Sequence, residues 1–155
     1  MQEVHETVKV LNELLQGEYM AVESFNNFIS RIKDEKIKRE FQGIHKQHRS
    51  NIEKLAAYIQ NLGGQPDENL GIKGKVGDLK VNMDLGFITD DAEILKKAIE
   101  GETRGVNMAE KIMRGNLDDK SRDVVGEILQ KDRISIRKLK TLAEQKCVSS
   151  LNIGR

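Results

Sequence analysis

A repeat of helical segments is the feature that most restricts the fold of this 155-residue chain. The segment "IHKQHRSNIEKL", residues 44–55, has a counterpart in "ILQKDRISIRKL", residues 128–139. The same offset of 84 residues pairs the "GE" at 17–18 with the "GE" at 101–102 and gives nine identities in 38 aligned positions. Any two amphipathic helices share part of their periodicity, so the constant register and the "GE" match are what favour an internal duplication.

The spacing of apolar residues predicts four helices. Leucine, isoleucine, valine and phenylalanine recur every three to four positions, which is typical of amphipathic helices. The predicted helices cover about residues 2–32, 35–62, 90–114 and 118–146. Asp34 and Asp90 are suited to cap the second and third helices, and Asp118 or Asp119 to cap the fourth. Gly63 can take the left-handed conformation that ends the second helix.

The connections between these helices predict the topology. The turns at 33–34 and 115–118 are short, so the helices that they join should be antiparallel neighbours. The segment of about residues 63–89 is long enough to travel the length of a bundle. We therefore expect an all-α fold, a ferritin-like four-helix bundle made of two repeated antiparallel helix hairpins joined by a long crossover. Residues 1–146 should form this single domain, and residues 147–155 a C-terminal tail.

Composition narrows the function classes. A third of the residues are charged and the formal net charge is only +1, which predicts no attraction to nucleic acid or to anionic lipid. No apolar run approaches the ~20 residues that cross a bilayer, and the first residues lack the pattern of a signal peptide. A single cysteine, Cys147, cannot form an internal disulfide. These features predict a cytoplasmic protein.

Each predicted helix places one ionisable residue in the middle of its apolar face. Glu18 and Glu102 occupy this place in the first and third helices, and His48 and Asp132 in the second and fourth. His48, for example, lies four residues after Ile44 and four residues before Ile52 on this face. Burying a lone charge is costly, so these four side chains should meet one another or share an ion.

The chain resembles a bacterial ferritin-like family of unknown function, related to the rubrerythrin and ferritin bundles. The features that carry this resemblance are "LNELLQGE" in the first helix, "LGGQP" after the second and "GE" in the third. Carboxylate-bridged di-metal bundles use one Glu from each of two helices and a Glu-x-x-His motif from each of the other two. The resemblance assigns Glu18 and Glu102 to the two single glutamates.

The chain departs from this motif at three of the six ligand positions. His45 stands in place of the first Glu of the Glu-x-x-His motifs, Leu129 in place of the second, and Asp132 in place of the second His. Leu129 cannot bind a metal, which disfavours a di-iron centre. The remaining candidate ligands are Glu18, His45, His48, Glu102 and Asp132. Imidazoles and carboxylates in this combination suit iron, zinc or manganese. The alternative for the same residues is a hydrogen-bonded network without a metal.

The sequence therefore predicts a bundle that binds a transition metal in its core, for stress protection or metal handling. The alternative is a metal-free structural or interaction module that has lost the di-metal site. The sequence leaves open whether the chain is an enzyme, and a di-iron oxidase or peroxidase is disfavoured by Leu129 and by the lack of a rubredoxin-type cysteine cluster. We also expect a homodimer, because the apolar residues of the crossover could form a side surface for a second copy.

Overall fold

The structure, a computed structural model, describes residues 2–68 and 90–153, and these residues form four long helices. The helices are α1 (Gln2–Ile29), α2 (Glu35–Asn61), α4 (Asp91–Met113) and α5 (Asp119–Ile153). Strands are absent from this part of the chain, as the all-α prediction requires. Most of the predicted crossover, about residues 63–89, lies outside the described residues, which include only its first part, 63–68.

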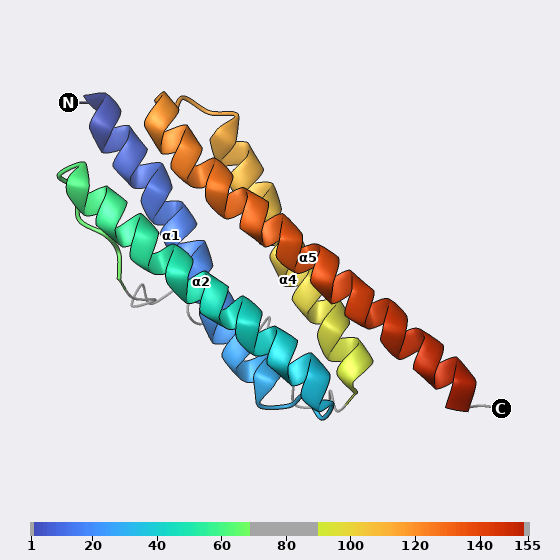
Figure 1. Ribbon diagram of the computed structural model, residues 1–155. Helices are drawn as coiled ribbons and strands as arrows, with labels where there is room; N and C mark the ends of the chain where they lie inside the picture. The colour runs from blue at the N-terminus through green and yellow to red at the C-terminus, as the bar shows by residue number, and fades with distance from the viewer. Residues whose placement is uncertain (1, 69–89, 154–155) are drawn as a thin grey trace.

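The helices are arranged as two hairpins that lie side by side (Figure 1). α1 packs mainly against α2, and α4 mainly against α5, while α1 also contacts α4 and α2 contacts α5. Asp91 joins the two hairpins at one end of the bundle. Its buried carboxylate accepts hydrogen bonds from the backbone N–H groups of Lys33 and Asp34, each at 2.9 Å. Because α4 begins beside the end of α1, these two helices run antiparallel.

The helix ends use the residues that the sequence predicted. The Asp34 side chain accepts a hydrogen bond from the Ile37 N–H at 3.0 Å, and the Asp90 side chain accepts one from the Ala92 N–H at 3.0 Å. Asp118 accepts from the Ser121 N–H at 3.2 Å, so it caps α5 rather than Asp119. These bonds satisfy N–H groups that have no partner within the first helical turn.

The α2 helix ends at a glycine. Gly63 has φ of +84°, a left-handed conformation that only glycine adopts without steric cost. Beyond it, the Gly64 N–H donates to the Ile59 carbonyl at 2.9 Å, which satisfies one of the last carbonyls of α2.

The last helix is longer than predicted. We expected it to end near Lys146 and a tail to follow, but α5 continues to Ile153. The sequence "CVSSLNI" contains neither glycine nor proline, so nothing in it stops the helix before Gly154. Val148 and Leu151 in this extension are exposed, with 55% and 69% of their surface accessible.

A polar layer divides the apolar core into two clusters. One cluster is built around Leu11, Leu15, Leu55 and Ile128, and the other around Phe25, Phe41, Leu95 and Leu139. Along every helix the residues of the two clusters flank one buried ionisable side chain. These four side chains are Glu18, His48, Glu102 and Asp132, each at most 5% exposed. The fold therefore brings the polar residues of four helices to one level of the bundle.

Within residues 2–68 and 90–153, no helix is both long enough and apolar enough to cross a membrane. The charged residues on the outer face of every helix account for this, because a membrane span tolerates few charges.

Candidate metal centre

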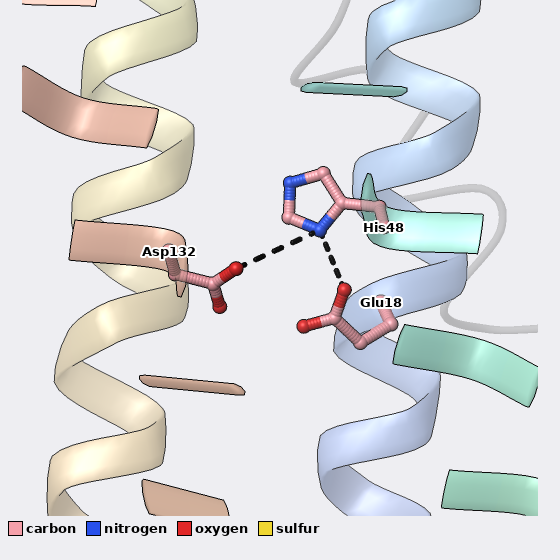
Figure 2. Close-up of side chains that lie close together, drawn as sticks. All are labelled: Glu18, His48 and Asp132. Atoms are coloured by element: carbon pink, nitrogen blue, oxygen red, sulfur yellow. Dashed lines mark hydrogen bonds and ion pairs between the residues drawn. The ribbon is translucent and has the colours of Figure 1, made fainter. Parts of the chain in front are cut away.

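His48 lies at the centre of the polar layer and contacts both neighbouring glutamates. Its Nδ1 is 2.5 Å from Glu18 Oε2, and its Nε2 is 2.7 Å from Glu102 Oε1. Asp132 approaches from the opposite hairpin, with Oδ1 3.9 Å from His48 Nδ1. Figure 2 shows the Glu18 and Asp132 carboxylates both directed toward Nδ1. Glu18 and Asp132 thus share one edge of the imidazole, and Glu102 occupies the other.

The contacts of His48 determine its protonation without a metal. Ionised carboxylates accept hydrogen bonds but cannot donate them, so both ring nitrogens must carry a proton to satisfy Glu18 and Glu102. Burial alone would lower the pKa of His48, but the charges of Glu18 and Glu102 outweigh it and raise the pKa well above its usual value. In the metal-free protein, His48 is therefore an imidazolium between two carboxylates.

Asp132 has a different environment. Its burial, followed by the negative charge of Glu18, raises the pKa of the Asp132 carboxyl to about 8, although His48 acts in the opposite direction. At neutral pH the metal-free protein therefore holds a proton on Asp132. Among the described residues, Asp132 Oδ1 and Glu102 Oε2 are buried without a hydrogen-bond partner. Unsatisfied buried oxygens of this kind are rare and are expected where a proton, an ion or a water is to be held.

A fifth buried residue supports the site. Asn51 is fully buried, and its Nδ2 donates to Glu18 Oε2 at 3.2 Å. Its own side-chain oxygen accepts from Gln47 Nε2 at 3.1 Å, which fixes the orientation of the amide. Our sequence analysis missed Asn51. The signal was present, because Asn51 lies seven residues after Ile44 and four before Leu55 on the same apolar face.

The donor atoms around Nδ1 fit a small cation. Ligand atoms of Glu18, His48 and Asp132 all lie within 4.8 Å of one another, and all three residues are buried. Zinc-like ions bind nitrogen and oxygen ligands at about 2.0–2.2 Å, so small side-chain movements would bring these atoms to a common ion. The buried Glu/His/Asp group is therefore compatible with a metal site.

Two other positions of the predicted motif take no part in this group. His45, one turn before His48, is partly buried, and its Nε2 is buried without a partner among the described residues. Burial, and then the charges of Arg49 and His48, lower the pKa of His45, so it is neutral at pH 7. Leu129 is 5% exposed and packs in the apolar core. Leu129 therefore offers no carboxylate at the position where the motif has its second glutamate.

Three solved structures with a similar arrangement of helices are distant from this chain in sequence. A dodecameric thioferritin, a bacterioferritin-related protein from Bacteroides fragilis, is 18% identical with a TM-score of 0.80, over 96% of this chain and 90% of that one. A ferritin-like, diiron-carboxylate protein from Bacillus anthracis is 21% identical with a TM-score of 0.69, over 92% of this chain and 99% of that one. These likenesses show a ferritin-like four-helix bundle, which confirms the predicted fold.

A third similar structure is a two-domain protein from Anabaena variabilis. It contains DJ-1/ThiJ/PfpI-like and ferritin-like domains, and it is 19% identical with a TM-score of 0.76. The match covers 93% of this chain and 37% of that one, so this chain spans well under half of the Anabaena protein.

Sequence comparison identifies a family but gives no established activity. No curated protein matches the chain in sequence. A family described as a domain of unknown function, DUF2383, matches residues 6–115, which include Glu18, His48 and Glu102. Because this match covers more than half of the 155 residues, the protein belongs to the DUF2383 family of domains of unknown function.

Proposed function

We propose that the protein binds one divalent transition metal through Glu18, His48 Nδ1 and Asp132. The observation that carries this proposal is the convergence of these three buried donors from three helices, with Asp132 Oδ1 lacking any other partner among the described residues. One imidazole and two carboxylates suit ferrous iron, zinc or manganese. An ion with an open coordination position would supply a Lewis-acid centre at this level of the bundle.

We assign Glu102 the role of orienting His48 rather than binding the metal. Glu102 Oε1 meets Nε2, the ring nitrogen that faces away from Glu18 and Asp132. A histidine that binds a metal through one nitrogen commonly donates its other N–H to a carboxylate, which fixes the tautomer and the orientation of the ring. The contact to Glu102 supports this arrangement for His48.

The charges at the site favour a cation. Three buried carboxylates face a single imidazole, and in the metal-free protein the excess negative charge is limited by the protons on His48 Nδ1 and Asp132. A divalent ion would replace both protons and leave each buried oxygen near it with an electrostatic partner. Leu129 supports one ion rather than two, because it provides no carboxylate to bridge a second ion.

Metal titration of matched glutamine variants tests these roles. We expect Glu18→Gln to abolish tight binding of Zn²⁺, Fe²⁺ or Mn²⁺, and Glu102→Gln to weaken it by about 10–100-fold, the usual effect of losing a residue that orients a ligand. Glu13→Gln, an exposed change on the same helix as Glu18, is the control and should leave affinity unchanged. Equal affinity in wild type and Glu18→Gln, measured by calorimetry, would contradict the proposed ligands.

A metal-free module is the second candidate function. It is favoured by one observation, that His48 as an imidazolium already satisfies one oxygen of each of Glu18 and Glu102. On this account the polar layer only fixes the register of the helices, and the function depends on the protein surface. A wild-type protein that takes up none of the three metals would support it.

Metal handling or stress protection in the cytoplasm is the role that we propose for the metal-binding form. The exposed thiol of Cys147, which has no disulfide partner in the sequence, suits that compartment.

Self-association is a further part of the proposal. The Bacteroides protein is described as dodecameric, and this chain matches most of its length. Exposed apolar side chains on this chain, which include Ile134, Val148 and Leu151, could pack against a second copy. We expect sedimentation velocity to find a homodimer or a larger assembly at micromolar concentration. A strict monomer at high micromolar concentration would contradict this.

A further inference from the structure

A cavity of about 520 Å³ lies between α1 and α4 and reaches the polar layer from the side of the bundle. Its floor includes the four ionisable residues of the layer, Glu18, His48, Glu102 and Asp132. Exposed residues of α4, among them Glu100 and Arg104, line its outer part, so the cavity opens to solvent. This volume falls in the range of about 300–1,000 Å³ that holds small organic ligands.

Glycines keep the cavity open on one side. A Cβ atom at Gly101 or Gly105 would meet no atom within 4 Å, so both positions border empty space. Gly17, which is 84 residues before Gly101, differs because a Cβ there would lie 2.8 Å from Met108 Cε. The position 84 residues before Met108 is Ser24, a shorter side chain. The Met108 side chain thus fills the space beside Gly17, and within residues 2–68 and 90–153 no equivalent side chain fills the space beside Gly101.

The walls are apolar and the outer part is cationic. The apolar lining residues are Leu14, Met20, Ala21, Phe25, Phe28, Ala98 and Met108. Lys97 and Arg104 also line the cavity, and neither forms a salt bridge with another described residue. They outnumber the one carboxylate of the outer part, Glu100. The floor carries three carboxylates, which would repel an acid group at the inner end of a ligand. A ligand with a single acid group, placed in the outer part, avoids this repulsion.

We propose that this cavity binds a small amphipathic carboxylic acid. The acid group would pair with Lys97 and Arg104, and the hydrocarbon part would pack against Phe25, Phe28 and the methionines above the polar layer. A charged head near the rim and an apolar body within the groove match the distribution of charge and apolar surface in the cavity. This inference does not depend on the proposed metal, because none of the residues assigned to the acid is a proposed ligand.

The first test fills the cavity and uses octanoate as the probe. Gly101→Leu places a side chain in the empty space, and we expect it to weaken octanoate binding at least about tenfold. We expect the same of Gly105→Leu. Gly43→Leu is the matched control, because Gly43 is also a helical glycine with no atom within 4 Å of a Cβ, but it lies outside the cavity. The helical content of each variant is checked by circular dichroism. Two independent cavity variants keep the test decisive if one of them fails to fold.

The second test examines the charged head. Lys97→Glu combined with Arg104→Glu should weaken octanoate binding by about tenfold or more, because a charge-assisted contact becomes a repulsion. Lys96→Glu, an exposed neighbour that does not line the cavity, should have little effect. Octanol, which has the same chain without the charge, should bind at least about tenfold more weakly than octanoate.

Three results would overturn the proposal. A lack of saturable octanoate binding to wild-type protein in calorimetry would show that the cavity does not take the acid. Binding that is equal in Gly101→Leu and Gly43→Leu would place the acid elsewhere. Equal affinity for octanoate and octanol would show that the charges of Lys97 and Arg104 do not contribute to binding.

Discussion

Replacing His48 with alanine should destabilise the metal-free protein by about 3–5 kcal/mol, the usual cost of removing one partner from a buried ion pair. The imidazolium is the only positive side chain in contact with Glu18 and Glu102 in the described structure. Without it, these buried glutamates either remain charged with no partner or must take up protons, and both outcomes cost free energy. The free energy of unfolding in urea, measured near pH 6 after chelation of metal, gives the size of the effect.

His45→Ala is the control for this change. His45 lies on the same helix, one turn from His48, and its Nε2 is buried without a partner among the described residues. Its removal deletes an unsatisfied polar atom rather than a satisfied pair, so we expect less than about 1 kcal/mol of destabilisation. If His45→Ala lowers the free energy of unfolding as much as His48→Ala does, the stabilisation that we assign to the His48 contacts is contradicted.

The His48 contribution should also depend on pH. The pKa of His48 is raised in the folded protein, so the folded state binds its proton more tightly than the unfolded state. The stabilisation is therefore fully present below the unfolded pKa of about 6.5 and is lost as the pH rises through the folded value. The difference between wild type and His48→Ala should therefore shrink as the pH rises above 6.5 and through the folded pKa of His48.

Asp132→Asn should make the metal-free protein more stable at alkaline pH. The pKa of Asp132 is about 8 in the folded protein and 3.8 for the free side chain, so the folded state binds more protons between these values. Wild type therefore loses stability as the pH rises from about 4 to 8. Asparagine resembles the protonated acid in shape but cannot ionise, so the variant should not show this loss. Because the pKa shift is large, the variant should be more stable than wild type by about a few kcal/mol above pH 8.

Bound metal should make wild type more stable than Asp132→Asn. On the proposed function Asp132 is a ligand, so excess Zn²⁺ raises the melting temperature of wild type and not of Asp132→Asn. Thermal unfolding of both proteins from pH 5 to 9, with chelator and with Zn²⁺, gives the two profiles. Parallel profiles in chelator would show that the Asp132 carboxyl is not buried as described. Equal stabilisation by Zn²⁺ would show that it is not a ligand.

The helical fold was predictable because it depends on local signals. The apolar period, the caps at Asp34 and Asp90 and the left-handed Gly63 each act over a few residues, and the structure confirms them. The end of α5 was predicted too early. The sequence contains no stop signal between Lys146 and Ile153, and helix ends without such signals are set weakly.

The candidate site was only partly predictable. A polar residue in the middle of each apolar face was enough to bring Glu18, His48, Glu102 and Asp132 to one level. The edge of the imidazole that each carboxylate meets depends on helix rotation and side-chain rotamers, which periodicity does not specify. Periodicity placed His48 on the apolar face, whereas His45 became a candidate ligand only through the resemblance, and the structure leaves it outside the Glu18, His48 and Asp132 group. The sequence could not show the cavity beside Gly101. Asn51 was missed because asparagine is uncharged and usually exposed, so its place on the apolar face was not taken as part of the site.

The position of a bound metal tests the central claim most directly. Crystals of untagged wild-type protein grown with Zn²⁺ should give one anomalous peak per chain, in contact with Glu18, His48 Nδ1 and Asp132, with Glu102 held at Nε2. Crystals of Glu18→Gln grown in the same way should give no peak there. No peak in the wild type, or one bound only by surface residues, would contradict the account and leave His48 as the centre of a metal-free polar layer.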